Sequence, residues 1–259
     1  MRDQGLNEAI RAAGGVSELA RRIGISQPSI SNWNRVPAER VVEVEAATGV
    51  ERVVLRPDLY DKGKPVSVDV SESDSARAQE YMLLAVLLGR APDADLLRRL
   101  AEVRADASPL GLAHAALAEA ASNTTIEKVE REYFDLFIGL GRGELLPYGS
   151  YYLTGFLHER PLARLRAELN ELGLARAEGI PEPEDHVAIL CEVMAGLAGG
   201  RFPAAVGSDR QLFEKHMKPW FGRFFADLEQ AEAANFYRRV GTLGRVFVDI
   251  ENEAFALPT

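Results

Sequence analysis

The stretch VSELARRIGISQPSISNW, residues 16–33, contains two short helical patterns separated by a glycine. A tight turn between two helices needs a residue that adopts a left-handed backbone conformation, which Gly24 does without steric cost. Two helices that cross steeply need a small residue where their backbones approach, and Ala20 supplies it. The larger apolar residues fall on the inward faces of the two helices: Leu19, Ile23, Ile25, Ile30 and Trp33. This stretch predicts two short helices that cross at a tight turn.

The outward face of the second helix is polar. Short amides and hydroxyls can read base edges in the major groove of DNA, and arginines can contact its phosphates. The candidate DNA-binding residues are Arg21, Gln27, Ser29, Ser31, Asn32 and Arg35.

The pattern continues through RVPAER (35–40), VEAATG (44–49) and LRPDLY (55–60). Over about residues 5–60 the sequence resembles the Cro-like helix-turn-helix domains of the YdaS type. The resemblance implies a domain that binds operator DNA, usually as a dimer. The alternative is a small helical domain whose DNA role has been replaced by protein binding. Residues 1–60 hold 8 basic and 8 acidic residues, which weakens the electrostatic attraction to phosphates that this fold normally uses.

The remaining 199 residues hold 22 basic and 31 acidic side chains, and they account for the whole net charge of −9. Such an acidic region repels polyphosphates, so we expect any nucleic-acid contact to come from the N-terminal region. The chain has 259 residues and one cysteine, so one or two domains are expected and an internal disulfide is excluded. Its four histidines lie far apart, and we expect no metal site.

We expect no membrane span, because no apolar stretch approaches the roughly 18 residues that a spanning helix needs. The residues after Met1 lead into no apolar signal-peptide core, which predicts a cytoplasmic protein.

Residues 61–75 (DKGKPVSVDVSESDS) mix glycine, proline, serine and charge without helical periodicity. We interpret them as a linker between a domain at 1–60 and a second domain at 76–259. The alternation of valines at 66, 68 and 70 leaves a short strand open as an alternative.

The second domain is helical by pattern, because apolar residues recur at three- and four-residue spacing between clear breakers. The predicted helices cover residues 80–88, 94–103, 110–121, 126–138, 162–172, 186–197, 212–228 and 236–250. Asp93, Ser108, Thr124 and Asp185 are expected to cap helix starts. The predicted fold class is all-α, with a small helix-turn-helix domain joined by a linker to a larger helical bundle.

Three segments of this domain form a recognisable set. They are EYFDLFIG (132–139) with PYGSYY (147–152), EPEDHVA (182–188), and HMKPWF (216–221) continuing through FFADL (224–228) to Phe236 and Tyr237. In this order and spacing they resemble the TorD/DmsD family of redox-enzyme maturation chaperones, over about residues 76–255. The resemblance implies an all-helical, cofactor-free protein. Its partner is the apo-form or twin-arginine leader peptide of a molybdenum-containing oxidoreductase.

A leader peptide combines a basic stretch with an apolar segment, so its receptor should offer an apolar groove beside acidic groups. The candidate peptide-binding residues are Tyr133, Phe137, Tyr148, Tyr152, Glu184, Asp185, His186 and Trp220. In the family that it resembles, the Asp-His pair at 185–186 is associated with peptide binding. Each residue also has a structural alternative: Asp185 as a helix cap, His186 as a helix-start residue, and the aromatic side chains as core.

Little in the chain suggests catalysis, and no catalytic residues are assigned. The glycine-rich segment 139–143 lacks the lysine and hydroxyl residue that end a phosphate-binding loop. The leading hypothesis is a chaperone fused to a DNA-binding module that gives transcriptional regulation. The alternative is a transcriptional regulator whose helical domain senses a ligand or only dimerises. The PEP segment at 181–183 would permit a domain-swapped homodimer.

Overall fold

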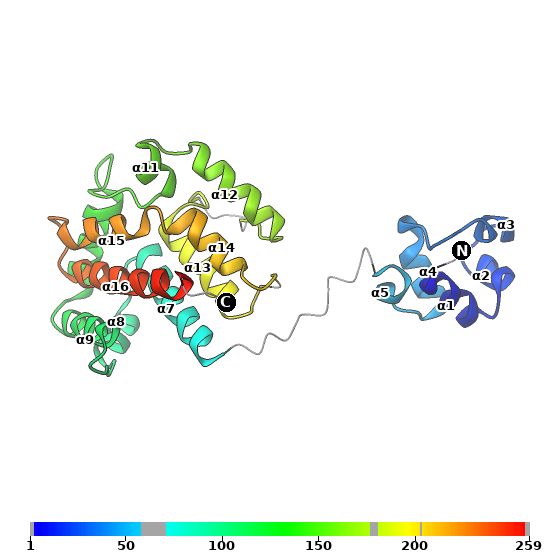
Figure 1. Ribbon diagram of the computed structural model, residues 1–259, viewed down its shortest axis with the longest axis horizontal. Coiled ribbons are helices and arrows are strands. Elements are labelled where there is room, and N and C mark those ends of the chain that lie inside the picture. The colour runs from blue at the N-terminus through cyan, green and yellow to red at the C-terminus, as the bar shows by residue number, and fades with distance from the viewer. Residues whose placement is uncertain (1–2, 58–70, 177–180, 203, 257–259) are drawn as a thin grey trace. The chain divides into compact units, whose positions relative to one another are not determined.

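The computed structural model describes residues 3–57, 71–176, 181–202 and 204–256. The chain divides into two compact units, Met1–Val68 and Asp69–Thr259, each with its own hydrophobic core (Figure 1). Within the described residues every regular element is a helix, apart from one isolated bridge between Tyr148 and His186. The prediction of an all-α fold is therefore confirmed. No helix in these parts of the chain is long and apolar enough to cross a membrane.

The smaller unit contains five short α-helices and one 3₁₀ turn among its described residues. They are α1 (Gln4–Ala13), α2 (Val16–Arg22), α3 (Gln27–Ser31), η1 (Ala38–Arg40), α4 (Val41–Thr48) and α5 (Arg52–Leu55). Helices α2 and α3 are the predicted crossing pair. Gly24 lies in the turn between them with φ of 67°, as the turn requires.

The core of the smaller unit is built from the residues that the sequence places inward. Leu19 and Ile30 are fully buried, and Ala20 is 3% exposed between them. Ile23, Ile25 and Trp33 pack against this core and remain partly exposed. The helix pair is therefore held by its own apolar face, and the opposite face is left to solvent.

The larger unit contains ten α-helices and two π-helical turns among its described residues. They are α7 (Glu72–Gly89), α8 (Ala94–Ala101), α9 (Pro109–Ser122), α10 (Ile126–Tyr133), η2 (Phe134–Ile138), α11 (Gly149–Thr154), α12 (Arg160–Glu171), α13 (Val187–Ala198), α14 (Ser208–Leu212), η3 (Phe213–Met217), α15 (Phe221–Gln230) and α16 (Phe236–Ala256). Helix α7 begins within the stretch 61–75 that we interpreted as a linker, and the alternating valines lie outside the described residues. Helix α11 was not predicted.

Side-chain caps explain where several of these helices begin. Ser71, Asp93 and Ser108 each accept a hydrogen bond from the backbone N–H three residues ahead. For α10 the cap is Thr125, one residue later than the predicted Thr124. The expected caps at Asp93 and Ser108 are thus confirmed, and the one at Thr124 is wrong by a single position.

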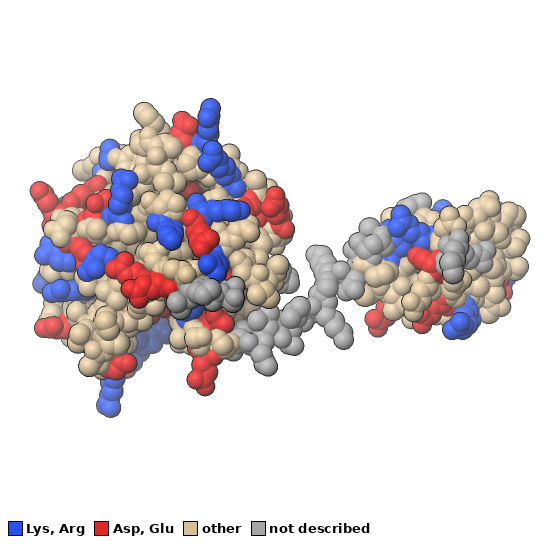
Figure 2. All heavy atoms as spheres, in the orientation of Figure 1, with Lys and Arg blue, Asp and Glu red and all other residues tan. Residues whose placement is uncertain are grey.

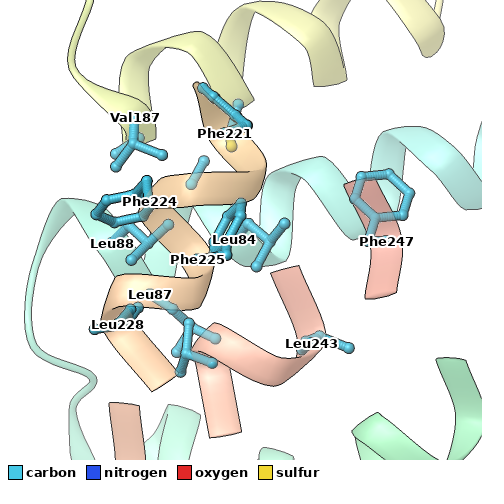
Figure 3. Close-up of a cluster of buried hydrophobic side chains, with 14 of the residues drawn as sticks. Leu84, Leu87, Leu88, Val187, Phe221, Phe224, Phe225, Leu228, Leu243 and Phe247 are labelled. Carbon is cyan, nitrogen blue, oxygen red and sulfur yellow. The ribbon is translucent and has the colours of Figure 1, made fainter. Parts of the chain in front are cut away.

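The core of the larger unit centres on α15, which lies between α7, α13 and α16. Figure 3 shows its labelled residues Phe221, Phe224, Phe225 and Leu228 among side chains of those three helices. All four are at most 1% exposed. Complete burial of an aromatic or leucine side chain contributes about 1.5–3 kcal/mol, so this cluster is a large part of the unit's stability.

The predicted continuous helix over residues 212–228 is interrupted. Helix α14 runs into the π-helical turn η3, in which the Lys218 N–H donates to the Phe213 carbonyl five residues back at 2.8 Å. The helix then stops at residues 218–220 and restarts at Phe221 as α15. Pro219 lies in this break, and because proline has no N–H it cannot donate the backbone hydrogen bond that would continue the helix.

Candidate functional site

Two short extended segments of the larger unit pair with each other and define the centre of the site. The Gly149 N–H donates to the Asp185 carbonyl at 2.9 Å, and the Val187 N–H donates to the Pro147 carbonyl at 2.8 Å. This antiparallel bridge places Tyr148 opposite His186, with ring centroids 5.1 Å apart in an edge-to-face arrangement. The start of α11 is thereby fixed against the start of α13.

Asp185 is 3% exposed, and only one of its two carboxylate oxygens accepts a hydrogen bond within the described residues. Its Oδ2 accepts the Ser150 backbone N–H at 2.7 Å, whereas its Oδ1 is buried without a hydrogen-bond partner among the described residues. The prediction that Asp185 caps α13 is wrong, because its side chain points across to the start of α11. The cap is the next residue, His186, whose Nδ1 accepts the Ala188 N–H at 3.2 Å.

His186 is 6% exposed, and burial is the main reason that its pKa is lowered to about 4. The negative charges of Glu182 and Asp185 raise the pKa but do not outweigh burial. The imidazole is therefore neutral at neutral pH, which suits the acceptor role of Nδ1 as a cap.

The two acidic residues that precede Asp185 already have partners within the unit. The Tyr148 hydroxyl donates to Glu182 Oε2 at 2.5 Å, and burial together with this bond raises the pKa of the phenol. Glu184 is paired with Arg166 of α12 at 2.8 Å. An incoming arginine would therefore have to compete with Arg166 for the Glu184 carboxylate.

A cavity of about 410 Å³ opens between α11, α12 and η3, and Asp185 is part of its wall. In Figure 1 α11 and α12 lie together along one edge of the larger unit. The wall combines apolar with charged side chains: Gly149, Leu153, Pro161, Arg164, Leu165, Glu168, Asp185, Lys215 and His216. This size is within the range of cavities that hold a small ligand or a few peptide side chains.

Glu168 connects two walls of this cavity. It accepts hydrogen bonds from Gln211 at 2.9 Å, from Lys215 at 3.3 Å and from His216 Nε2 at 2.9 Å. Burial would raise the pKa of its carboxyl, but these donors, His216 first, outweigh it and hold the pKa below its ordinary value. Glu168 is satisfied, so Asp185 is left as the wall residue with an unpartnered carboxylate oxygen.

An apolar rim lies beside the cavity, in the residues that follow Leu153. Leu153 is 41% exposed, Phe156 is 69% exposed and Leu157 is 39% exposed. The next residue, His158, has a φ of 62°, which is unusual for a residue other than glycine, and its N–H donates to Ser150 Oγ at 3.2 Å. Three exposed apolar side chains in five residues offer a surface to an apolar partner.

The predicted aromatic residues do not form one wall. Tyr133 and Phe137 pack 5.1 Å apart and both contact Tyr237, away from the cavity wall. Trp220 is 1% exposed and donates its indole N–H to the His216 carbonyl at 2.7 Å. Tyr152 is 8% exposed and donates to Asp227 at 2.9 Å. Trp220 and Tyr152 therefore pack in the core and are not part of the cavity wall at Asp185, and Tyr152 lines a different cavity of about 390 Å³.

Trp220 still shapes the site from behind. A Cβ atom at position 149 would lie 3.1 Å from the Trp220 Nε1 atom, so glycine lets the start of α11 approach the indole.

Several residues of this wall were not among the predicted peptide-binding residues: Leu153, Arg164, Leu165, Glu168 and Lys215. Two of them carried a signal, because Leu165 and Glu168 are one turn apart on α12 and both are buried. A carboxylate on the apolar stripe of a helix indicates a buried polar contact. His216 was named in the third sequence segment but was not chosen as a site residue.

The candidate DNA-binding residues are all exposed in the smaller unit. Gln27, Ser29, Ser31 and Asn32 are all exposed, and Gln27 donates to Ser31 Oγ at 3.2 Å. Arg35 is exposed as well.

Arg21 is held by Glu18 of the same helix at 2.5 Å, and its hydrogen bond is the main cause of the lowered pKa of Glu18, about 2. Figure 2 shows basic and acidic side chains interspersed on the visible face of this unit, without one extended basic patch.

The larger unit thus combines an all-helical fold with a cavity of about 410 Å³, and its described residues hold no cluster of side chains that could bind a metal ion. Residues 104–226 match the family described as nitrate reductase delta subunit, and residues 6–63 match the family described as bacterial toxin YdaS.

Curated relatives carry the name chaperone protein TorD. The protein of Shewanella loihica is 24% identical over 73% of this chain and 97% of its own length. The protein of Vibrio cholerae is 25% identical over 70% of this chain and 82% of its own length. A crystal structure of a redox enzyme maturation protein from Archaeoglobus fulgidus matches 67% of this chain and 93% of its own, with 20% identity and a TM-score of 0.47.

The larger unit is similar to the TorD chaperones, and the smaller unit is similar to the YdaS family. The resemblances identified in the sequence are confirmed. The curated relatives are named chaperones, and neither of these two carries the name of an enzyme.

Proposed function

We propose that this chain is a cytoplasmic chaperone that binds the leader peptide or the apo-form of a molybdenum-containing oxidoreductase during its maturation. Kinship to the TorD proteins supports the class of function. The main support for the site is Asp185, which lies in the wall of a cavity of about 410 Å³ and has one buried carboxylate oxygen without a hydrogen-bond partner among the described residues. A buried oxygen without a partner costs about 1–3 kcal/mol, and a ligand that donates to it recovers that free energy.

The cavity and its rim match the two parts of a leader peptide. A guanidinium or backbone N–H of the peptide donates to Asp185 Oδ1, and the apolar segment lies on Leu153, Phe156 and Leu157. The net charge of −9 speeds the encounter with a basic peptide and disfavours acidic partners. The cations in the wall, Arg164 and Lys215, restrict the basic part of the peptide to the side of Asp185.

A titration with a synthetic leader peptide tests this proposal. The peptide has two consecutive arginines followed by about ten apolar residues, and binding is followed by fluorescence anisotropy of an attached dye. We expect Asp185→Asn to weaken binding at least tenfold, which corresponds to about 1.4 kcal/mol. Glu171→Gln is the matched control, because it removes one exposed carboxylate from α12 outside the cavity wall, and it should bind like the parent. Equal affinity of the parent and Asp185→Asn would remove the site from the proposal.

We infer that the smaller unit binds DNA through the exposed face of α3, with a dimer reading two half-sites. Its support is the YdaS-type match and the four exposed amide and hydroxyl residues 27, 29, 31 and 32. Selection from a pool of random duplexes would yield the sequence that the full chain prefers. Gln27→Ala or Asn32→Ala should then weaken binding to that sequence by about 1–3 kcal/mol and leave binding to unrelated DNA unchanged. Recovery of no preferred sequence would contradict this inference.

The fusion suggests that client binding regulates DNA binding, which requires the peptide to favour one dimer geometry over another. Titration of the leader peptide into the complex with the selected duplex tests it, and an unchanged DNA affinity at saturating peptide would remove the coupling. The alternative function is a transcriptional regulator whose helical domain senses another ligand or only dimerises. Tight specific DNA binding together with no binding of any twin-arginine peptide would favour that alternative.

A further inference from the structure

A second cavity of about 470 Å³ lies on the larger unit between the first turns of α7, the first turns of α9 and the C-terminal half of α16. Its wall consists of Ala76, Arg77, Gln79, Glu80, Leu83, Leu110, His114, Phe247 and Ile250. It shares no lining residue with the cavity at Asp185.

Glu80 is the acidic residue of this wall and is 8% exposed. Its Oε2 atom is 2.9 Å from His114 Nε2. Its Oε1 atom is buried and has no hydrogen-bond partner within the part of the chain that the structure describes. The arrangement repeats that of Asp185: a buried carboxylate in a cavity wall uses one oxygen and leaves the other unsatisfied.

The other charges around this cavity favour a positive ligand. Arg77 is the arginine of the wall, and it forms ion pairs with Glu251 at 2.7 Å, Asp209 at 3.0 Å and Asp74 at 3.0 Å. Its guanidinium is thus shared among three carboxylates and makes no bond to Glu80. Glu80 and the three carboxylates around Arg77 together outnumber Arg77 and His114, so an anionic ligand would meet repulsion and a cationic one attraction.

The rest of the wall is mostly apolar. Leu83, Leu110 and Phe247 contribute hydrocarbon surface, and Ile250 at the edge is 39% exposed. An apolar wall with one unsatisfied acceptor fits a ligand that has an apolar body and a single hydrogen-bond donating head. We propose that this cavity binds an organic cation, in which an ammonium or guanidinium group on an apolar body donates to Glu80 Oε1.

Phenethylammonium is a suitable probe, because it joins an ammonium group to a phenyl ring through two methylenes. Binding to the full chain is measured by saturation-transfer NMR and by the shift of the His114 ring signals. The neutral isostere 2-phenylethanol should bind at least tenfold more weakly, and 3-phenylpropionate should not compete. Glu80→Gln should weaken phenethylammonium binding at least tenfold, because it replaces the carboxylate by an uncharged amide of the same shape.

Control variants separate this site from the first cavity and from loss of folding. Asp185→Asn should leave phenethylammonium binding unchanged, and Glu80→Gln should leave leader-peptide binding unchanged. Leu110→Trp fills the cavity without altering charge and should also abolish binding, with thermal melting to verify that each variant is folded. Equal binding of the amine and the alcohol, or retention of binding in folded Glu80→Gln, would overturn the proposal.

A second probe identifies the source of the cation. Acetyl-phenylalanyl-arginine amide presents the same chemistry as a side chain of a polypeptide. Preference for the free amine assigns the cavity to a small molecule, and preference for the dipeptide assigns it to a protein partner. Binding of neither probe would overturn the proposal.

Discussion

The starts of α16 and α11 each have a buried carboxylate from a distant part of the chain, and the two carboxylates differ in how many of their oxygens have hydrogen-bond partners. At the start of α16, Glu132 accepts the N–H groups of Asn235 and Tyr237 with Oε1 and that of Phe236 with Oε2, at 2.6–3.1 Å. At the start of α11, Asp185 accepts the Ser150 N–H with Oδ2 and leaves Oδ1 without a partner among the described residues.

The difference separates a structural carboxylate from one that is available for binding. Glu132 satisfies the free N–H groups at a helix N-terminus, where a negative charge is also favoured by the helix dipole. Asp185 lies in a cavity wall, and its open oxygen costs stability unless a ligand uses it. Burial alone does not distinguish them, since both are less than 10% exposed.

The largest expected effect is on stability, at Glu132. Glu132→Ala removes the acceptor of three backbone N–H groups, and we expect the free energy of unfolding to fall by about 4 kcal/mol in urea titrations followed by circular dichroism. Glu130→Ala, an exposed residue on the same helix, is the control and should change it by less than about 0.5 kcal/mol. A similar effect of the two substitutions would mean that Glu132 is not the cap it is described to be.

The next effect depends on pH and concerns His186. Its pKa is about 4 in the folded chain against 6.5 when exposed, so the unfolded state binds the proton more readily. The stability from the neutral ring is complete above about pH 6.5 and is lost as pH falls toward 4, by up to about 3 kcal/mol. The free energy of unfolding should therefore fall more steeply over this range in the parent than in His186→Asn, which keeps a capping side chain. Parallel curves for the two proteins would contradict the lowered pKa.

A smaller effect on stability is expected at Asp185, the second carboxylate of this comparison. Asp185→Asn keeps an oxygen that can accept the Ser150 N–H, so the free energy of unfolding should change by less than about 1 kcal/mol. Binding of the leader peptide should nevertheless fall at least tenfold. If Asp185→Asn lowered the free energy of unfolding as much as Glu132→Ala does, Asp185 would have a structural role like that of Glu132 and not a binding role.

The smallest effect concerns Glu184. Arg166→Gln frees this carboxylate from its ion pair, and the affinity for an arginine-containing leader peptide should rise about twofold, because exposed pairs contribute only about 0.2–1 kcal/mol. Arg160→Gln makes the same change in net charge on the exposed face of α12 and serves as the control. An equal rise in both variants would assign the effect to net charge and not to Glu184.

The fold could be predicted from the sequence further than the site could. Helical spacing predicted α7 to α10, α12, α13 and α16, and Gly24 marked the turn of the helix pair, because these features depend on neighbours within a few residues. The interruption at 218–220 had a local signal in Pro219, which the apolar pattern on either side obscured.

The site depends on contacts that join distant segments. The bond between Asp185 and Ser150 spans 35 residues, and the bond between Glu168 and His216 spans 48. No local pattern says which oxygen of a carboxylate will lack a partner. The same limit explains why Trp220 was expected in a groove and is found in the core, where Gly149 packs against its indole.

The π-helical turn η3 determines how the residues before it are rotated about the helix axis relative to the residues after it. It holds one residue more than an α-helical turn, and that residue lies between Phe213 and Met217. Deleting one residue there would restore ordinary helical hydrogen bonding but rotate the residues before the deletion relative to those after it by about 100°. Lys215 and His216 would then leave the cavity wall. In a comparison of homologous chains, a one-residue gap at this point therefore marks a different binding site, even where every other segment aligns.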